Sequence, residues 1–171
     1  EVLLQWRVRY QRRRVGVVYV TREFRFPLDV GSRVDFWACD AAALPFATEA
    51  FSMIVSLNTL DCMHNPLELF QSIASALKPT GRALIGCPYD WSTSATPVEQ
   101  WLGGHSQRGE DSGSSEAIVR RLLTAGAPYA IPGLRMIGEQ DADWSVRLHD
   151  RSSVQYTSHL VALAKDGTRS F

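Results

Sequence analysis

The 171 residues carry 18 acidic and 18 basic side chains, and 45% of them are hydrophobic. Balanced charge gives no overall field that attracts nucleic acid or an anionic membrane, and no apolar run reaches the ~20 residues of a membrane span. No signal-peptide pattern opens the chain. We therefore expect one globular domain over residues 1–171 in the cytoplasm, with neither nucleic acid nor membrane among its partners.

The three cysteines are too far apart to suggest a shared site. Cys39, Cys62 and Cys87 form no C-x-x-C pair, and their number is odd. Free thiols are the expectation, and no metal centre is predicted.

The N-terminal stretch alternates apolar and basic residues around Gly16. This period of two predicts a β-hairpin over residues 7–26, with Arg12–Arg14 at its turn. A basic tip can contact phosphate, but a solvated tip is the reading that we favour.

Three short apolar runs follow, and they predict buried strands at Val34–Cys39, Ser52–Leu57 and Arg82–Cys87. Asn65-Pro66 is a strong helix start, and Lys78–Gly81 ends that helix. The apolar positions at helical spacing are Leu67, Phe70, Ile73, Ala74 and Leu77. Strands that alternate with helices favour a parallel sheet covered on both faces, with a ligand beyond the carboxyl ends of the strands. Asp40, Asn58 and Tyr89–Trp91 stand at those ends.

The remaining chain is less regular. A short helix is predicted at Pro97–Leu102, a mobile loop at His105–Ser115, and a helix at Glu116–Thr124 capped by Ser115. Two strands, Asp143–His149 and Val154–Ala164, are separated by four polar residues, which is the spacing of an antiparallel hairpin.

Asp40 admits two readings. Its carboxylate, beside the free N–H groups of Ala41 and Ala42, offers the acceptor and donor that an adenine edge needs. Equally, the carboxylate caps the turn that follows. The residue types alone leave both open.

The surrounding motifs resemble those of class I S-adenosylmethionine-dependent methyltransferases of the type 11-like group. The matching pieces are Asp40-Ala41, Leu44-Pro45-Phe46, Phe51–Val55 and Leu77–Gly81, with Ser52 and Thr80 departing from the usual Asp and Gly. The resemblance implies a Rossmann-like three-layer α/β fold, a mostly parallel sheet with a C-terminal antiparallel hairpin, and S-adenosylmethionine as cofactor. The cofactor-binding residues that it implies are Asp40, Ala41, Asn58, Thr59 and Leu60.

The glycine-rich loop of that family is absent from these residues. The resemblance therefore implies a domain without its first strand–helix units. In that reading the hairpin at 7–26 is an insertion, 34–91 is the cofactor-binding core, and 92–171 is the substrate side.

A narrower resemblance lies downstream. Cys87–Trp91 and Thr96–Gly104 are similar to the S-P-Y-x-W and T-P-x-x-x-W-L-G-G runs of a subgroup that includes the C-terminal domain of ovothiol-biosynthesis enzymes. It implies methyl transfer to a nitrogen of a small aromatic or zwitterionic molecule. The substrate-binding residues would be Asp61, Tyr89, Trp91 and Trp101.

If the acceptor nitrogen loses a proton, Asp61, Asp90 or His149 can take it, and we assign the catalytic role to Asp90 and His149. His64 and His159 are interpreted as structural, and His105 as part of a lid. Two other classes remain as alternatives. One is a methyltransferase-like module that binds or scaffolds without catalysis, and the other is a nicotinamide-dependent oxidoreductase.

Overall fold

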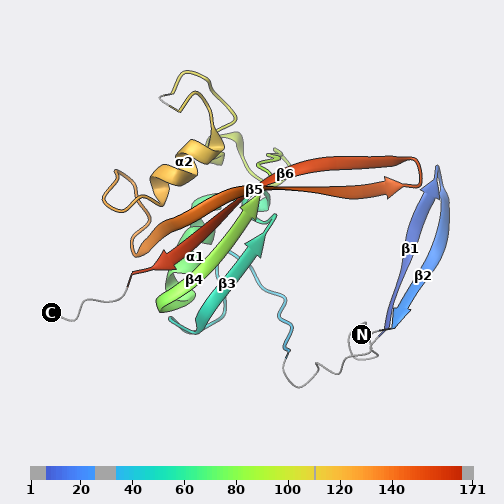
Figure 1. The fold of residues 1–171 in the computed structure, drawn as a ribbon, viewed down its shortest axis with the longest axis horizontal. Coiled ribbons are helices and arrows are strands. Elements are labelled where there is room, and N and C mark those ends of the chain that lie inside the picture. Colours follow the sequence, from blue (N-terminus) through green and yellow to red (C-terminus); the bar gives the residue numbers. More distant parts are fainter. Residues whose placement is uncertain (1–6, 26–33, 110, 167–171) are drawn as a thin grey trace. The chain divides into compact units, whose positions relative to one another are not determined.

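The computed structural model describes residues 7–25, 34–109 and 111–166 (Figure 1). They group into two compact units. Of these residues, the first unit holds 7–25, 34–38 and 144–156, and the second holds 39–109, 111–143 and 157–166.

The first unit contains the predicted hairpin. Strands β1 (Arg7–Val15) and β2 (Val18–Arg25) pair antiparallel, and Gly16 adopts the left-handed φ of 52° that a two-residue turn requires. Arg12–Arg14 lie in β1 and not at the turn, so that part of the prediction is wrong. Arg12 and Arg14 instead form ion pairs with Asp150 in the same unit.

The second unit is built on a four-stranded sheet with the order β3-β4-β6-β5. Strand β3 (Phe51–Leu57) runs parallel to β4 (Leu77–Cys87), and β4 runs antiparallel to β6 (Ser152–Lys165). Strand β5 (Leu134–His149) joins its neighbour β6 through Asp150–Arg151, a connection so short that the two must be antiparallel. The predicted terminal hairpin is confirmed, with longer strands and a shorter break than expected. The prediction of a mostly parallel sheet is wrong for the described residues, which form one parallel pair.

In the described residues, two α-helices and two short 3₁₀ turns accompany the sheet. Helix α1 (Pro66–Ala76) is capped by Asn65, whose side chain accepts from the Leu67 N–H, as predicted. Helix α2 (Ser115–Leu122) is capped by Ser114, one residue earlier than predicted. The 3₁₀ turn η2 (Leu60–Cys62) follows β3, and the 3₁₀ turn η3 (Val98–Gln100) follows the loop after β4. The turn η3 stands where the sequence predicts a helix at Pro97–Leu102.

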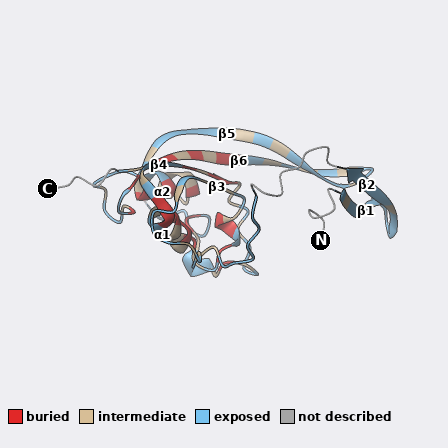
Figure 2. Ribbon diagram, turned by 90° about the horizontal axis from the view of Figure 1, so that it is seen from below, coloured by how far each residue is buried: buried red, intermediate tan, exposed pale blue. Residues whose placement is uncertain are grey.

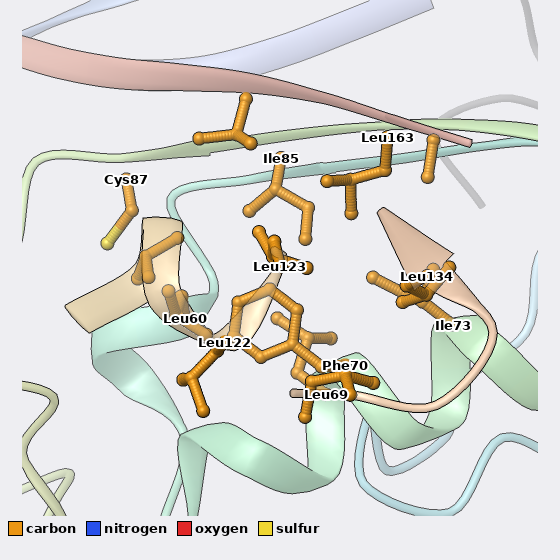
Figure 3. Packing of buried hydrophobic residues seen from close by; sticks show 14 of the residues in the cluster. Leu60, Leu69, Phe70, Ile73, Ile85, Cys87, Leu122, Leu123, Leu134 and Leu163 are labelled. Atoms are coloured by element: carbon orange, nitrogen blue, oxygen red, sulfur yellow. The ribbon is translucent and has the colours of Figure 1, made fainter. Parts of the chain in front are cut away.

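Both α-helices lie on the same side of the sheet (Figure 2). Alternate residues of β4 and β6 face them, including Ile85 and Leu163, which point toward Phe70 and Leu123 (Figure 3). Phe70 and Leu163 have no exposed surface. The residues of β3 that alternate the other way remain open to solvent, and they are Met53, Val55 and Leu57. The expected cover on both faces is therefore wrong for the described part of the chain.

The strand predicted at Val34–Cys39 does not form. Its residues have no regular structure and are exposed, and no described strand other than β4 pairs with β3. Asp35 instead accepts hydrogen bonds from the Phe36 N–H and the Trp37 indole N–H, both at 2.9 Å. An apolar run alone cannot specify a strand, since a strand also needs a neighbour.

The one-sided core predicts a large contrast between two truncations. Phe70→Ala should lower the free energy of unfolding by about 3–5 kcal/mol, because it empties a fully buried site. Val55→Ala, on the open face and 54% exposed, should cost less than about 1 kcal/mol. Urea denaturation measures both values. An equal cost for the two variants would contradict the burial described here.

Candidate functional site

The turn after Asp40 is closed by the Asp40 carboxylate. Its Oδ1 accepts from the Ala42 N–H at 2.9 Å, and its carbonyl accepts from the Ala43 N–H at 3.1 Å. Ser72 of α1 donates to the Ala42 carbonyl at 2.7 Å and so ties the turn to the helix. The turn-capping reading is confirmed, and the expectation of a free Ala42 N–H is wrong.

Asp40 nevertheless keeps capacity for a ligand. Within the described residues no hydrogen bond engages its Oδ2 or the Ala41 N–H, and the Asp40 side chain is exposed. One carboxylate oxygen and one backbone donor are therefore available side by side, which is the pair that an adenine edge requires.

The end of β3 presents polar groups at the same edge of the sheet as the end of β4. Asn58 leaves the strand with a φ of 53°, and its N–H donates to the Gly86 carbonyl at 2.7 Å. Asn58 is exposed and Thr59 is partly exposed. The Leu60 side chain, however, is 1% exposed and belongs to the core. Leu60 can therefore contact a ligand only through its backbone.

Asp61 is buried and links two loops through hydrogen bonds. It is 4% exposed, and its Oδ2 accepts from the Asp90 N–H at 2.8 Å. Thr96, which is fully buried, donates to the Met63 carbonyl at 2.6 Å and lies 3.2 Å from the Asp61 carbonyl. These bonds hold the loop after β4 against the turn after β3.

Three aromatic side chains that the sequence assigned to the substrate lie together. The Tyr89 and Trp91 rings stack at 6.3 Å, and the Trp91 and Trp101 rings at 6.1 Å, between centroids. Both indole N–H groups donate a hydrogen bond, that of Trp91 to Ser115 Oγ at 3.1 Å and that of Trp101 to the Thr96 carbonyl at 2.9 Å. The result is a fixed, partly exposed aromatic wall at the carboxyl end of β4.

Glycine is required where this wall meets α2. Gly103 has a φ of 95°, and a Cβ there would lie 2.8 Å from the Gly113 carbonyl oxygen and from the Ser115 nitrogen. The Gly104 N–H donates to the same carbonyl at 2.8 Å. This close backbone approach requires glycine at position 103, and the left-handed φ of 78° favours glycine at position 104.

The sequence did not predict the hydrogen-bond network around His159. Its side chain in β6 is 4% exposed, with Nδ1 at 2.8 Å from the Tyr89 hydroxyl and Nε2 at 2.7 Å from Glu139 Oε2. Arg120 donates its Nε–H to both Glu139 oxygens, at 2.8 and 2.9 Å. No local pattern signals this network, because its members lie far apart in sequence and His159 stands within an apolar strand.

The environment shifts several pKa values in this region. Hydrogen bonds from Arg120 and then His159 hold the pKa of Glu139 below its usual value. Burial raises the pKa of the Tyr89 hydroxyl well above its ordinary value, and burial raises that of the Cys87 thiol to about 12. Glu139 is therefore an anion at neutral pH, while Tyr89 and Cys87 keep their protons.

The other predicted residues lie in separate places. Asp90 is exposed beside the aromatic wall, on the loop that Asp61 holds. His149 belongs to the first unit, where its Nδ1 accepts from the Arg151 N–H at 3.2 Å. His105 is exposed, with its Nδ1 3.3 Å from the Gly103 carbonyl. Their predicted roles stay predictions.

Two further findings concern the described residues alone. They contain no cluster of three histidine, cysteine or acidic side chains that would suit a metal ion. None of their helices has both the length and the apolar character that crossing a membrane demands.

A family model described as a methyltransferase domain matches this chain from β1 into β4. This match covers residues 14–85. The matched stretch includes Asp40, Asn58 and Asp61. It ends two residues before Cys87, so the aromatic wall lies outside it.

Solved structures add distant likenesses. A SAM-dependent methyltransferase from Methanosarcina mazei is 14% identical, with a TM-score of 0.48 over 75% of this chain and 65% of its own. A putative methyltransferase from Bacillus halodurans is 11% identical, with a TM-score of 0.45 over 76% and 70%. The chain thus spans 65% of the length of the first of these. No curated protein matches it in sequence.

The role of Asp61 in linking the two loops predicts a stability difference between two neighbouring acids. Asp61→Ala should cost about 1–3 kcal/mol of unfolding free energy, because it removes the buried carboxylate that accepts from the Asp90 N–H. Asp90→Ala keeps that bond, since only its backbone takes part, and should change stability by less than about 0.5 kcal/mol. Chemical denaturation of the two variants provides the comparison.

The lowered pKa of Glu139 predicts one component of the acid response. A carboxyl group with a lower pKa in the folded than in the unfolded state stabilises the fold above its unfolded pKa. That contribution is lost as the pH falls below about 4.5 and through the folded value. Glu139→Gln should remove this component, so the stability difference from the unaltered protein should shrink on acidification. A constant difference between pH 7 and pH 3 would contradict the assignment.

Proposed function

We propose that this protein transfers the methyl group of S-adenosylmethionine to a nitrogen of a small molecule. The observation that carries the proposal is the methyltransferase-domain match over residues 14–85, which includes the turn at Asp40. The aromatic wall of Tyr89, Trp91 and Trp101 supports it, because a rigid aromatic surface suits a cationic or planar ligand.

The residues at the strand ends fit the adenosine part of this cofactor. Asp40 Oδ2 can accept from the exocyclic amine of adenine, and the Ala41 N–H can donate to the neighbouring ring nitrogen. Asn58 and Thr59 offer polar groups at the adjoining strand end. When bound, the cofactor supplies an electrophilic methyl group on a sulfonium.

The acceptor side is built from the loop after β4. Tyr89, Trp91 and Trp101 would form one wall for an aromatic or zwitterionic acceptor, in line with the resemblance of this loop to the ovothiol-related subgroup. Attraction between a cation and an aromatic face contributes about 0.5–2 kcal/mol per ring. Asp61 serves this wall indirectly by holding the Asp90 N–H, and Asp90 itself is exposed beside the acceptor position.

Calorimetry with S-adenosylhomocysteine tests the cofactor site. Asp40→Asn keeps an oxygen to cap the Ala42 N–H but places an amide donor where the adenine amine needs an acceptor. We expect the affinity to fall about 10- to 100-fold, as expected for losing a hydrogen bond to a charged group. Asp35→Asn, in the exposed stretch before this turn, is the matched control and should bind like the unaltered protein.

The outcomes separate the possibilities. Absence of binding to the unaltered protein would refute the proposed function. Binding that Asp40→Asn leaves unchanged would refute the placement of adenine. A screen for transfer of labelled methyl groups to histidine, thiol-substituted histidines and other small nitrogen compounds then tests the acceptor class.

A further inference from the structure

Tyr89, His159 and Glu139 form one continuous hydrogen-bonded chain. The Tyr89 hydroxyl lies 2.8 Å from His159 Nδ1, and His159 Nε2 lies 2.7 Å from Glu139 Oε2. The three residues come from the loop after β4, from β6 and from β5. His159 is almost completely buried between its two partners, and Arg120 of α2 anchors the far end by donating to Glu139.

The charges along this chain fix the direction of each hydrogen bond. Glu139 is ionised, because it accepts from Arg120 as well as from His159, and a carboxylate can only accept. When the imidazole is neutral, its one proton sits on Nε2, where the Glu139 carboxylate accepts it. His159 Nδ1 is left with a lone pair, so the Tyr89 hydroxyl must donate to it.

The Tyr89 oxygen is consequently an acceptor toward any further partner, because its own proton is committed to His159. A ligand at the aromatic wall must then offer this oxygen an N–H or O–H group. The arrangement has the same order of groups as a carboxylate–imidazole–hydroxyl triad, with a phenol in place of the serine.

We propose that Glu139, His159 and Tyr89 are a proton relay in which Tyr89 touches the methyl acceptor and removes its proton. This inference rests on the proposed function and names the base for it. Tyr89 is the catalytic residue, and His159 and Glu139 are positioning residues that act through it. The relay selects acceptors whose nitrogen carries a proton to be lost.

The proton balance is complete within these groups. Methyl transfer would form a bond from the acceptor nitrogen to the methyl carbon and break the carbon–sulfur bond, and sulfur would keep the electron pair. The nitrogen proton passes to the Tyr89 oxygen while the phenol proton passes to His159 Nδ1. The imidazolium then lies against the Glu139 carboxylate, which stabilises its charge. Because burial keeps Tyr89 from ionising by itself, the two proton transfers must be coupled.

Other charged groups face the relay and bear on its pH response. The charges of Glu116 and Arg120 of α2 act on the pKa of Tyr89 in opposite directions, Glu116 raising it and Arg120 lowering it. The charge interaction with His159 also lowers the pKa of Glu116. Cys87 lies opposite His159 in the ladder of β4 and β6, with its thiol protonated and Asp61 beside it. Glu139 alone among these carboxylates bonds the imidazole directly.

Nitrogen-15 NMR of the histidine rings tests the hydrogen-bond direction without any substrate. We expect His159 to be the Nε2–H tautomer in the unaltered protein and to lose this preference in Glu139→Gln. His64→Gln, which removes an exposed histidine beside the cap of α1, is the control and should leave the His159 signals unchanged. An Nδ1–H tautomer in the unaltered protein would overturn the relay.

Kinetics with a thiol-substituted histidine as the methyl acceptor tests the proton transfer. Tyr89→Phe and His159→Gln should each lower kcat about 10²- to 10⁴-fold, as general-base catalysis predicts. The residual kcat should rise with hydroxide concentration, because the proton then leaves to solvent. The affinity for S-adenosylhomocysteine should stay within about twofold in both variants.

The results discriminate between the two proposals. Variants that keep kcat and the original pH profile overturn the relay while methyl transfer stands. Equal losses of kcat and of S-adenosylhomocysteine affinity overturn it too, because they show a structural role. If the unaltered protein transfers no methyl group to this probe and binds no S-adenosylhomocysteine, the proposed function and the relay fall together.

Discussion

Packing of two helices against a single face of the sheet is the constraint on which the second unit depends. Apolar burial is the largest favourable contribution to folding, and here it is concentrated between β4, β6, α1 and α2. The same packing brings Arg120 of α2 to Glu139 of β5 and sets Ser115 beside Trp91. The polar contacts of the candidate site are therefore consequences of where the helices pack, and not independent additions to it.

Elements with strong local signals could be predicted from the sequence. The cap at Asn65, the start of α1, the strands β3 and β4 and the N-terminal hairpin each follow from residues within a few positions of one another. Sheet partners could not. The run Val34–Cys39 has the composition of a buried strand yet remains exposed, and β6 lies between β4 and β5 and not at an edge. Periodicity identifies an apolar face, but it carries no information on which strand will cover or pair with it.

The candidate site divides in the same way. Tyr89, Trp91 and Trp101 were predicted together because they stand close in sequence after a strand, and the structure stacks them. Leu60 was assigned to the cofactor from its place in a motif, but the three-dimensional structure commits its side chain to the core. His159 carries no local mark at all, since its partner Tyr89 is 70 residues away. Hydrogen bonds between buried groups that are distant in sequence are therefore the part of a site that is hardest to predict from sequence patterns.

The strand order has a consequence for how the protein is made. Strand β6 is the last strand to leave the ribosome among those described, yet it is the one that links β4 to β5. At ~5–20 residues per second, Tyr89 waits roughly 4–14 s for His159 to be synthesised. Until then β4 has an unpaired edge, and the Tyr89 hydroxyl lacks its imidazole partner. The sheet and the site are thus completed in one late event, so a chain released early would lack both.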